Sequence, residues 1–406
     1  GGSLLGPFTS NGAILLPKGG GATFDVERLL VADTLARGRV RPENGGLTGT
    51  LALSGGGVDG NLRLMGQPGG QRVQGSFTAR NARFGNAGDI RIRTADGSID
   101  AFFSEGRSDI DATLRAQGIS QGKFVLGTLD ARAKIVNGSG NVAAKLAGTR
   151  GSRFAFDARA AVAPNRIAVS GSGSFRRQPI RLSKPAIFVR DDAGWRLRPT
   201  AISYGGGTLR AAGQFGGSAE LELRFAEMPL ALLDLAYSDL GLGGRATGTV
   251  NYRGGLQPTG DAKLRIKGLS RSGLFVSSRP LDIGLNAALS ADAMAMRAVI
   301  ANDGKTVGRV QARISDLAPT GDLIGRLYDG RLFAQARYSG EAGTLWRLTG
   351  FELFDLSGPV GLGADIGGSL TDPVIRGVVR AQGARLESGV SGTVVTDIAA
   401  QGRFNG

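Results

Sequence analysis

The sequence predicts an all-β chain whose successive strands are apolar on one side and charged on the other. Four segments alternate with period two, which places apolar and charged side chains on opposite faces of a strand: Leu62-Arg63-Leu64, Ile90-Arg91-Ile92-Arg93, Ala219 to Phe225, and Leu264-Arg265-Ile266-Lys267. The 68 glycines gather at turns and strand ends, where tight reversals need them. Turns about every 8 to 12 residues are typical of all-β folds. Because the composition hardly changes along the 406 residues, we expect one elongated repeat body.

The strands can be followed in order along the chain. Phe24 to Leu35 fits either a helix face or two strands, whereas a regular meander is predicted from 60 to 160 and further strands from Ile180 to Phe215. The alternation stops near Pro229, which can open a short helix. The predicted parts of this single continuous body are an amino-proximal part, 1–227, a short helical interruption, 228–240, and continuing repeats, 241–406.

Two segments indicate an internal repeat. Thr249 to Pro258 and Ala364 to Pro373 each run from a strand through a double glycine and a leucine to a proline, and about 115 residues separate them. The proline breaks the pairing before the next strand begins. The similarity favours a repeating architecture without fixing a period.

The composition excludes most familiar catalytic and metal sites. The chain has no Cys and no His, so thiolate zinc sites, disulfides and the commonest general base are all absent. Two carboxylate pairs look like catalytic sites, but a turn and the solvent-exposed face of a strand explain them: Asp191-Asp192, and Asp109 with Asp111. Ser183 and Lys184 are adjacent, so their side chains point to opposite faces of an extended segment. We therefore assign no catalytic residue, no metal and no cofactor.

The net charge of +15 has two interpretations. It can mark a surface for polyanions, or it can reflect a coding bias toward arginine, since only eight of the 49 basic residues are lysine. The arginines are spread one or two per strand and aromatic residues are few, so the sequence does not favour nucleic acid as a partner. Attraction to anionic phospholipid headgroups remains as a second possibility.

Both ends of the sequence suggest a piece of a longer protein. Gly1-Gly2-Ser3-Leu4-Leu5 lacks the start of a signal peptide, and the chain stops abruptly at Phe404-Asn405-Gly406. No stretch reaches the roughly 18 to 20 apolar residues of a membrane-spanning helix. We expect any membrane anchor to lie outside this sequence.

The second half of the chain resembles the TamB family, the subunits of the translocation and assembly module within the wider AsmA-like group. Met228 to Leu233 followed by Leu242 to Val250 carries part of the resemblance. Leu332 to Gly340, continuing through Leu345 to Gly350 and on to Asp355 to Pro359, resembles the alphaproteobacterial branch more closely. The resemblance covers residues 194 to 406, and the first half shares mainly the general composition.

This resemblance implies a fold, a function and a location. The fold is an elongated, taco-like β-sheet or β-solenoid with a continuous apolar groove on its concave side and one short helix. The implied function is that of a periplasmic phospholipid conduit between the inner and outer membranes, which supports outer-membrane biogenesis. The full-length protein would be anchored in the inner membrane, and the outer-membrane barrel subunit TamA would be a partner of regions outside this sequence.

Physical chemistry also favours such a groove. A sheet with one wet face must cover its other face, and acyl chains can do so at about 0.8 kcal/mol per buried methylene. The alternatives are a closed, dry core and a scaffold or chaperone for outer-membrane protein assembly that pairs nascent strands with an open sheet edge. An outer-membrane barrel is disfavoured because the strands are short and charged on one face. The predicted lipid-groove lining is Leu62, Leu64, Ile90, Ile92, Leu221, Leu223, Phe225, Leu264 and Ile266.

Overall fold

The chain is almost entirely β-structure. Its structure, a computed structural model, describes residues 2–3, 6–15, 22–31, 33–84, 90–216, 219–235, 237, 240–272, 278–349 and 353–405. It is 77% strand and 5% helix, which confirms the all-β class that the alternating pattern predicted. The chain divides into two compact units, Gly1–Val189 (unit 1) and Arg190–Gly406 (unit 2).

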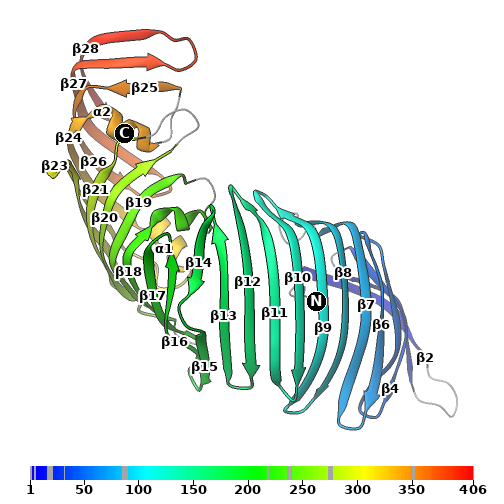
Figure 1. The fold of residues 1–406 in the computed structure, drawn as a ribbon. Coiled ribbons are helices and arrows are strands. Elements are labelled where there is room, and N and C mark those ends of the chain that lie inside the picture. Colours follow the sequence, from blue (N-terminus) through cyan, green and yellow to red (C-terminus); the bar gives the residue numbers. More distant parts are fainter. Residues whose placement is uncertain are drawn as a thin grey trace. The chain divides into compact units, whose positions relative to one another are not determined.

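Unit 1 is a meander of antiparallel strands, each paired with its neighbour in sequence (Figure 1). The ambiguous segment Phe24 to Leu35 contributes to two strands, β3 and β4, which reverse at Asp33 with φ 64°. The strand β13 pairs with both β14 and β15. The strands are β1 (Gly2–Ser3), β2 (Gly6–Leu15), β3 (Thr23–Val31), β4 (Thr34–Glu43), β5 (Gly46–Ser54), β6 (Val58–Gln67), β7 (Gly70–Phe84), β8 (Ile90–Ser104), β9 (Arg107–Gln121), β10 (Phe124–Val136), β11 (Ser139–Arg150), β12 (Ser152–Ala163), β13 (Arg166–Phe175), β14 (Gln178–Leu182) and β15 (Ala186–Asp191), the last of which ends just beyond the unit boundary.

Unit 2 has the same antiparallel pairing, and the helices that the structure describes lie in it. Its strands pair in sequence order from β16 to β24, and then β24 pairs with β26, β26 with β27, β25 with β27, and β27 with β28. The elements are β16 (Gly194–Tyr204), β17 (Gly207–Gly216), β18 (Glu220–Pro229), the 3-10 helix η2 (Leu230–Leu235), β19 (Leu242–Arg253), β20 (Thr259–Arg271), β21 (Leu281–Leu289), β22 (Met294–Asn302), β23 (Lys305–Ser315), α1 (Leu323–Asp329), β24 (Arg331–Glu341), α2 (Ala342–Thr349), β25 (Phe354–Ser357), β26 (Pro359–Gly368), β27 (Pro373–Ser388) and β28 (Val394–Asn405).

The register of these strands gathers the apolar residues of each unit on one face, which we call the inner face. Because side chains alternate along a strand, cross-strand partners lie on the same face of the sheet. A row of unit 1 is Leu51, Leu62, Gly75, Ile99, Ala112, Ala133, Val142 and Ala160, each paired with the next. A row of unit 2 is Phe225, Gly248, Leu264, Leu285, Ala298, Val310, Ala336, Ala364, Gly377 and Phe404. The opposite, outer face carries the charged residues between them.

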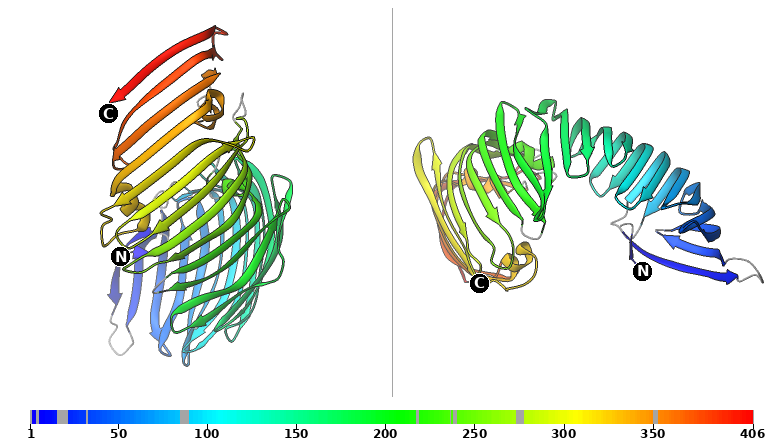
Figure 2. Two further views of the ribbon diagram at one scale, coloured as in Figure 1. Left: turned by 90° about the vertical axis from the view of Figure 1, so that its left-hand side faces the viewer. Right: turned by 90° about the horizontal axis from the view of Figure 1, so that it is seen from below.

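Interruptions of the ladder recur at the same level in neighbouring strands. In unit 1, Asn81, Arg93, Gly118 and Gly127 lie outside the paired register of β7 to β10. In unit 2 the register shifts between Phe225 and Met228, between Gly243 and Arg245, and between Ile266 and Leu269. Such bulges bend a strand and increase its twist. The strands of unit 2 are accordingly bowed, as Figure 2 shows.

The helices of unit 2 are short. The predicted interruption at 228–240 contains η2, and its residues 236, 238 and 239 lie outside the described part of the chain. Since β18 and β19 pair directly across it, η2 is an insertion within unit 2. Two further helices, α1 and α2, were not predicted. Their 7 and 8 residues are too few for a helical period to emerge from the sequence.

Glycine at position 248 is required by the backbone and is a direct test of the register. Gly248 has φ 141°, and a Cβ there would collide with the carbonyl oxygen of Lys263 on the paired strand. We predict that Gly248→Ala lowers the free energy of unfolding of unit 2 by roughly 1 to 3 kcal/mol, measured by urea denaturation.

The matched control is Gly284→Ala on β21, where an added Cβ meets no atom within 4 Å. This change should leave stability within about 0.5 kcal/mol of the unmodified chain. Equal effects of the two substitutions would contradict the pairing of β19 with β20.

Candidate functional site

The residues predicted to line a groove all lie on the inner faces. In unit 1, Leu62 and Leu64 on β6 and Ile90 and Ile92 on β8 flank β7, with Leu62 paired to Gly75 and Ile92 to Ala82. In unit 2 the structure brings β18 and β20 together on either side of β19. Each of the nine side chains is half-buried: Leu62, Leu64, Ile90, Ile92, Leu221, Leu223, Phe225, Leu264 and Ile266.

In unit 2 the spacing of these residues is set by glycine. Phe225 and Leu264 both pair with Gly248, which lies between them and has no side chain. In the neighbouring row, Leu223 pairs with Val250, which pairs with Ala262. Around Gly248, a residue without a side chain therefore lies between two large side chains of the inner face.

The inner faces are apolar but not closed. The chain exposes 23968 Å², whereas a compact protein of this mass exposes about 15,000 Å² and two separate globules of half the mass about 18,000 Å². More than half of the fully buried apolar residues are alanines, and most large aliphatic side chains of the inner faces keep part of their surface exposed. Within each unit the described strands pair in one antiparallel ladder, and the described residues form no separate second sheet.

Part of the inner face of unit 2 is covered by α1 (Figure 1). Leu327 packs against Ile314, Leu317 and Leu332 at one end of the strands. Next to this contact, a pocket of about 220 Å³ lies between α1 and the strands; it is lined by Val250, Asn251, Tyr252, Gly260, Asp261, Ala262, Ala287, Ala288, Leu289, Met294, Leu323 and Leu327. We call this the α1 pocket. The sequence feature that could have indicated α1 is Asp322, a typical N-cap residue. Its carboxylate accepts a hydrogen bond from the Gly325 N–H at 2.9 Å and caps the helix.

Some of the charges of the outer face form ion pairs across strands. The guanidinium of Arg72 donates to both oxygens of Asp100, at 2.8 and 2.7 Å, and Gln74 donates to the same carboxylate at 2.8 Å. These hydrogen bonds, that of Arg72 first, hold the pKa of Asp100 below its usual value. The pairing explains why alternate residues are charged: they form ladders of ion pairs on the wet side of the sheet.

The carboxylates that resembled catalytic sites in the sequence have the same structural role. Asp191 accepts hydrogen bonds from Arg196 at 2.9 and 3.1 Å, and Asp109 from Arg107 at 2.7 and 3.2 Å. The pKa of each is lowered, chiefly by its arginine. In the described ranges of the chain, no three His, Cys, Asp or Glu side chains gather closely enough to hold a metal ion.

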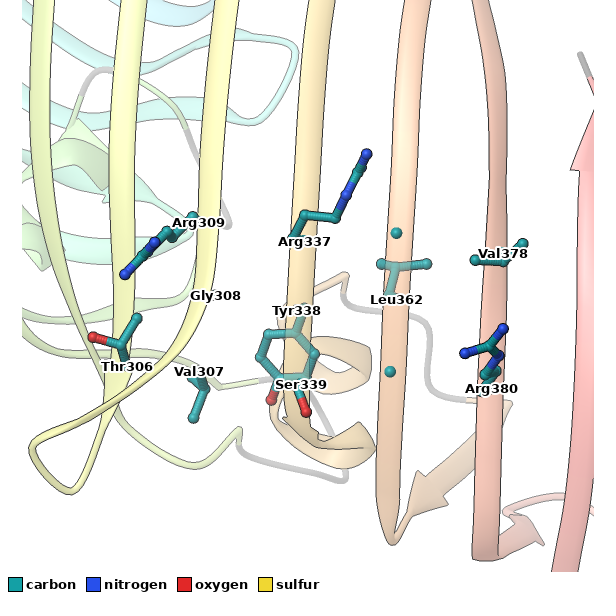
Figure 3. Close-up of a pocket in the computed structure, with 12 residues that line it drawn as sticks. Thr306, Val307, Gly308, Arg309, Arg337, Tyr338, Ser339, Leu362, Val378 and Arg380 are labelled. Carbon is teal, nitrogen blue, oxygen red and sulfur yellow. The ribbon is translucent and has the colours of Figure 1, made fainter.

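A basic hollow of about 560 Å³ lies over β23, β24, β26 and β27 (Figure 3). Arg337 and Arg380 extend toward β26 from the strands on either side, where Gly361 and Gly363 leave room for them. The Arg337 guanidinium is held there by Asp365 at 3.0 Å and by the carbonyl of Ala364 at 2.9 Å. Arg337 is thus part of an ion pair with Asp365 on the outer face.

The helix α2 follows the end of β24, opposite the end at which α1 lies. It carries Arg347, which forms a partly buried ion pair. Arg347 Nε and Nη2 donate to the two oxygens of Asp355 at 2.9 and 2.6 Å, a bidentate pair. The hydrogen bond from Arg347 is the main reason that the pKa of Asp355 is lowered, although burial opposes it. Sequence reasoning missed this pair because its members come from two elements that it did not assign.

Comparison of the chain with protein-family models, with curated proteins and with solved structures gave no match. The resemblance to the TamB family therefore depends on the sequence phrases alone. Among the residues that the structure describes, no helix combines the length and apolar character needed to cross a bilayer.

The Arg347–Asp355 pair predicts a pH dependence of stability. Because the folded pKa of Asp355 is below the unfolded value of about 3.9, its carboxylate stabilises the fold above that pH, and this contribution is lost as the pH falls through the folded pKa. We predict that Asp355→Asn destabilises unit 2 by about 1 to 2 kcal/mol at pH 7, in urea denaturation. The difference from the unmodified chain should narrow below about pH 4.

Asp316→Asn is the control, because the pair that Asp316 forms with Arg331 at 2.8 Å is largely exposed. Removing that pair should change stability at pH 7 by less than about 1 kcal/mol. A loss for Asp355→Asn that stays the same between pH 7 and pH 3 would contradict the assigned role of the carboxylate.

Proposed function

We propose that this chain is a phospholipid conduit of the TamB type, in which lipids slide along the apolar inner face. The observation that carries the proposal is that the inner face is apolar from strand to strand in each unit and yet remains half-exposed. Leucine, isoleucine and phenylalanine side chains in this state remain partly in contact with water unless another apolar surface covers them. Acyl chains match such a surface in chemistry and in shape.

The energetics favour movement over tight binding. Each buried methylene contributes about 0.8 kcal/mol, so an acyl chain gains several kcal/mol by lying on the inner face. Where a glycine lies between two larger residues, as in Phe225, Gly248 and Leu264, large side chains recur on every second strand. An acyl chain that moves by two strands there therefore exchanges similar contacts.

The setting of this conduit follows from the family resemblance. We propose that the chain works in the periplasm, as a segment of a longer protein anchored in the inner membrane, and that the barrel subunit TamA is a partner of other regions. The phrase Leu332 to Gly340, which carries much of the resemblance, forms most of β24. Its residues Leu332, Ala334, Ala336 and Tyr338 belong to the inner-face rows, and Leu332 and Ala334 lie in the buried cluster against which Leu327 of α1 packs.

The test is whether lipids accompany the protein and depend on the inner face. The full chain would be expressed in a bacterial periplasm, purified without detergent and examined by native mass spectrometry and lipid extraction. We predict several phospholipids per chain, and a loss of most of them in Leu264→Asp combined with Ile266→Asp. Because both side chains are half-exposed, the variant should keep its circular dichroism spectrum.

Val299→Asp is the matched control, since Val299 is a 43% exposed aliphatic residue on the outer face of β22. This variant should retain its lipids. A stable, lipid-free chain would contradict the conduit and favour the scaffold for outer-membrane protein assembly, and unfolding of the inner-face variant would indicate a closed core.

A further inference from the structure

Arg326 is a buried cation beside the apolar inner face of unit 2. It lies on α1 between Leu323 and Leu327, the two residues that the helix contributes to the α1 pocket. Only 7% of its surface is exposed. An arginine stays protonated in proteins, and a buried charge is costly unless hydrogen bonds and an opposite charge compensate it.

The described residues provide little of this compensation. Arg326 Nη2 donates to the carbonyl oxygen of Ala291 at 2.8 Å, whereas the buried Nε has no acceptor in the described part of the chain. No carboxylate lies within ion-pair distance of this guanidinium among the described residues. Arg347 provides the comparison, because its Nε and Nη2 both bind Asp355. In Arg326 the corresponding Nε and Nη2 atoms contact no carboxylate among the described residues.

The position of Arg326 relates it directly to the α1 pocket. Ala291, which accepts its hydrogen bond, belongs to the turn between Leu289 and Met294, and both of these residues line the pocket. Arg326 does not itself line the pocket, but residues on either side of it in α1 and on either side of its hydrogen-bond partner Ala291 do. A polar group at the end of the strands beside an apolar space fits the two parts of an amphiphile.

We propose that Arg326 binds the phosphate of a phospholipid whose acyl chain enters the α1 pocket. This assignment rests on the conduit function proposed above and adds a headgroup site to it. A phosphate oxygen accepts the Nε–H in the way that Asp355 accepts that of Arg347. The phosphate supplies the missing negative charge, and the pocket of about 220 Å³ receives part of one acyl chain.

Phosphate can come from a lipid or from a free phosphate compound, and calorimetry separates the two. The full chain is titrated with monomeric dihexanoylphosphatidylglycerol, with dihexanoylglycerol, which lacks phosphate, and with glycerol phosphate, which lacks acyl chains. We expect Arg326→Met to weaken binding of the phospholipid about tenfold or more and to leave binding of dihexanoylglycerol unchanged. Arg331→Met, at the exposed start of β24, is the control and should bind all three as the unmodified chain does.

Each other outcome overturns the assignment in a distinguishable way. Phospholipid binding that is unchanged in Arg326→Met removes the headgroup site and leaves the conduit intact. Glycerol phosphate that binds as tightly as the phospholipid makes this a site for a free phosphate. Failure of both acyl compounds to bind contradicts the conduit itself.

A second measurement keeps Arg326 in place and so does not depend on the folding of a variant. The chain contains no cysteine, so Tyr328→Cys, at a half-exposed position of α1, can carry a single nitroxide. We expect this label to broaden the phosphorus-31 NMR signal of dihexanoylphosphatidylglycerol strongly, and a label at Val299→Cys on the outer face to leave it sharp. Equal broadening from the two positions would show that the phosphate does not reside at α1.

Discussion

The structure depends on one constraint: each strand forms its backbone hydrogen bonds with an antiparallel neighbour, in a register that keeps apolar residues opposite apolar residues. Because side chains alternate with period two, a slip by one residue would move leucines to the wet face and arginines to the inner face. The glycines secure this register at places such as Gly248, where no other residue fits against the paired carbonyl. The ladder therefore determines which surface each unit can offer.

Two different faces follow from that ladder. On the outer face, arginines and aspartates such as Arg72 and Asp100 satisfy one another across strands, so the high arginine content serves the sheet itself. On the inner face, aliphatic residues are interspersed with glycine and alanine, and most of the large ones keep part of their surface exposed. The helices α1 and α2 lie at opposite ends of the strands of unit 2. On α2, Arg347 is paired with Asp355. On α1, the buried Nε of Arg326 has no acceptor among the described residues. This difference between the two arginines is the basis for the headgroup site that we propose at Arg326.

The sequence predicted the parts of this architecture that depend on local periodicity. The alternation in Leu264-Arg265-Ile266-Lys267 was enough to assign a strand and its two faces, and the glycine turns were enough to predict the meander. The nine residues proposed as a lining lie on the inner faces, because period two alone decides the side on which a residue lies. Contacts between distant segments could not be predicted in this way. Leu323 and Val250 line the α1 pocket together although they are far apart in the sequence. Arg347 and Asp355 form their bidentate pair from two different elements. No periodic pattern in the sequence indicates either contact. Short helices such as α1 also resemble loops in a sequence dominated by strands.

If phospholipid lies only on the inner face of the sheet, a photo-crosslinking scan along β20 will detect it on alternate residues. A photoreactive amino acid would be placed in turn at each of residues 262 to 267, in the chain purified with its lipids, and crosslinked phospholipid would be measured by mass spectrometry. We expect crosslinks at Ala262, Leu264 and Ile266, and none at Lys263, Arg265 and Lys267. Crosslinks without this alternation, or their absence at all six positions while lipid is present, would contradict this placement of the phospholipid.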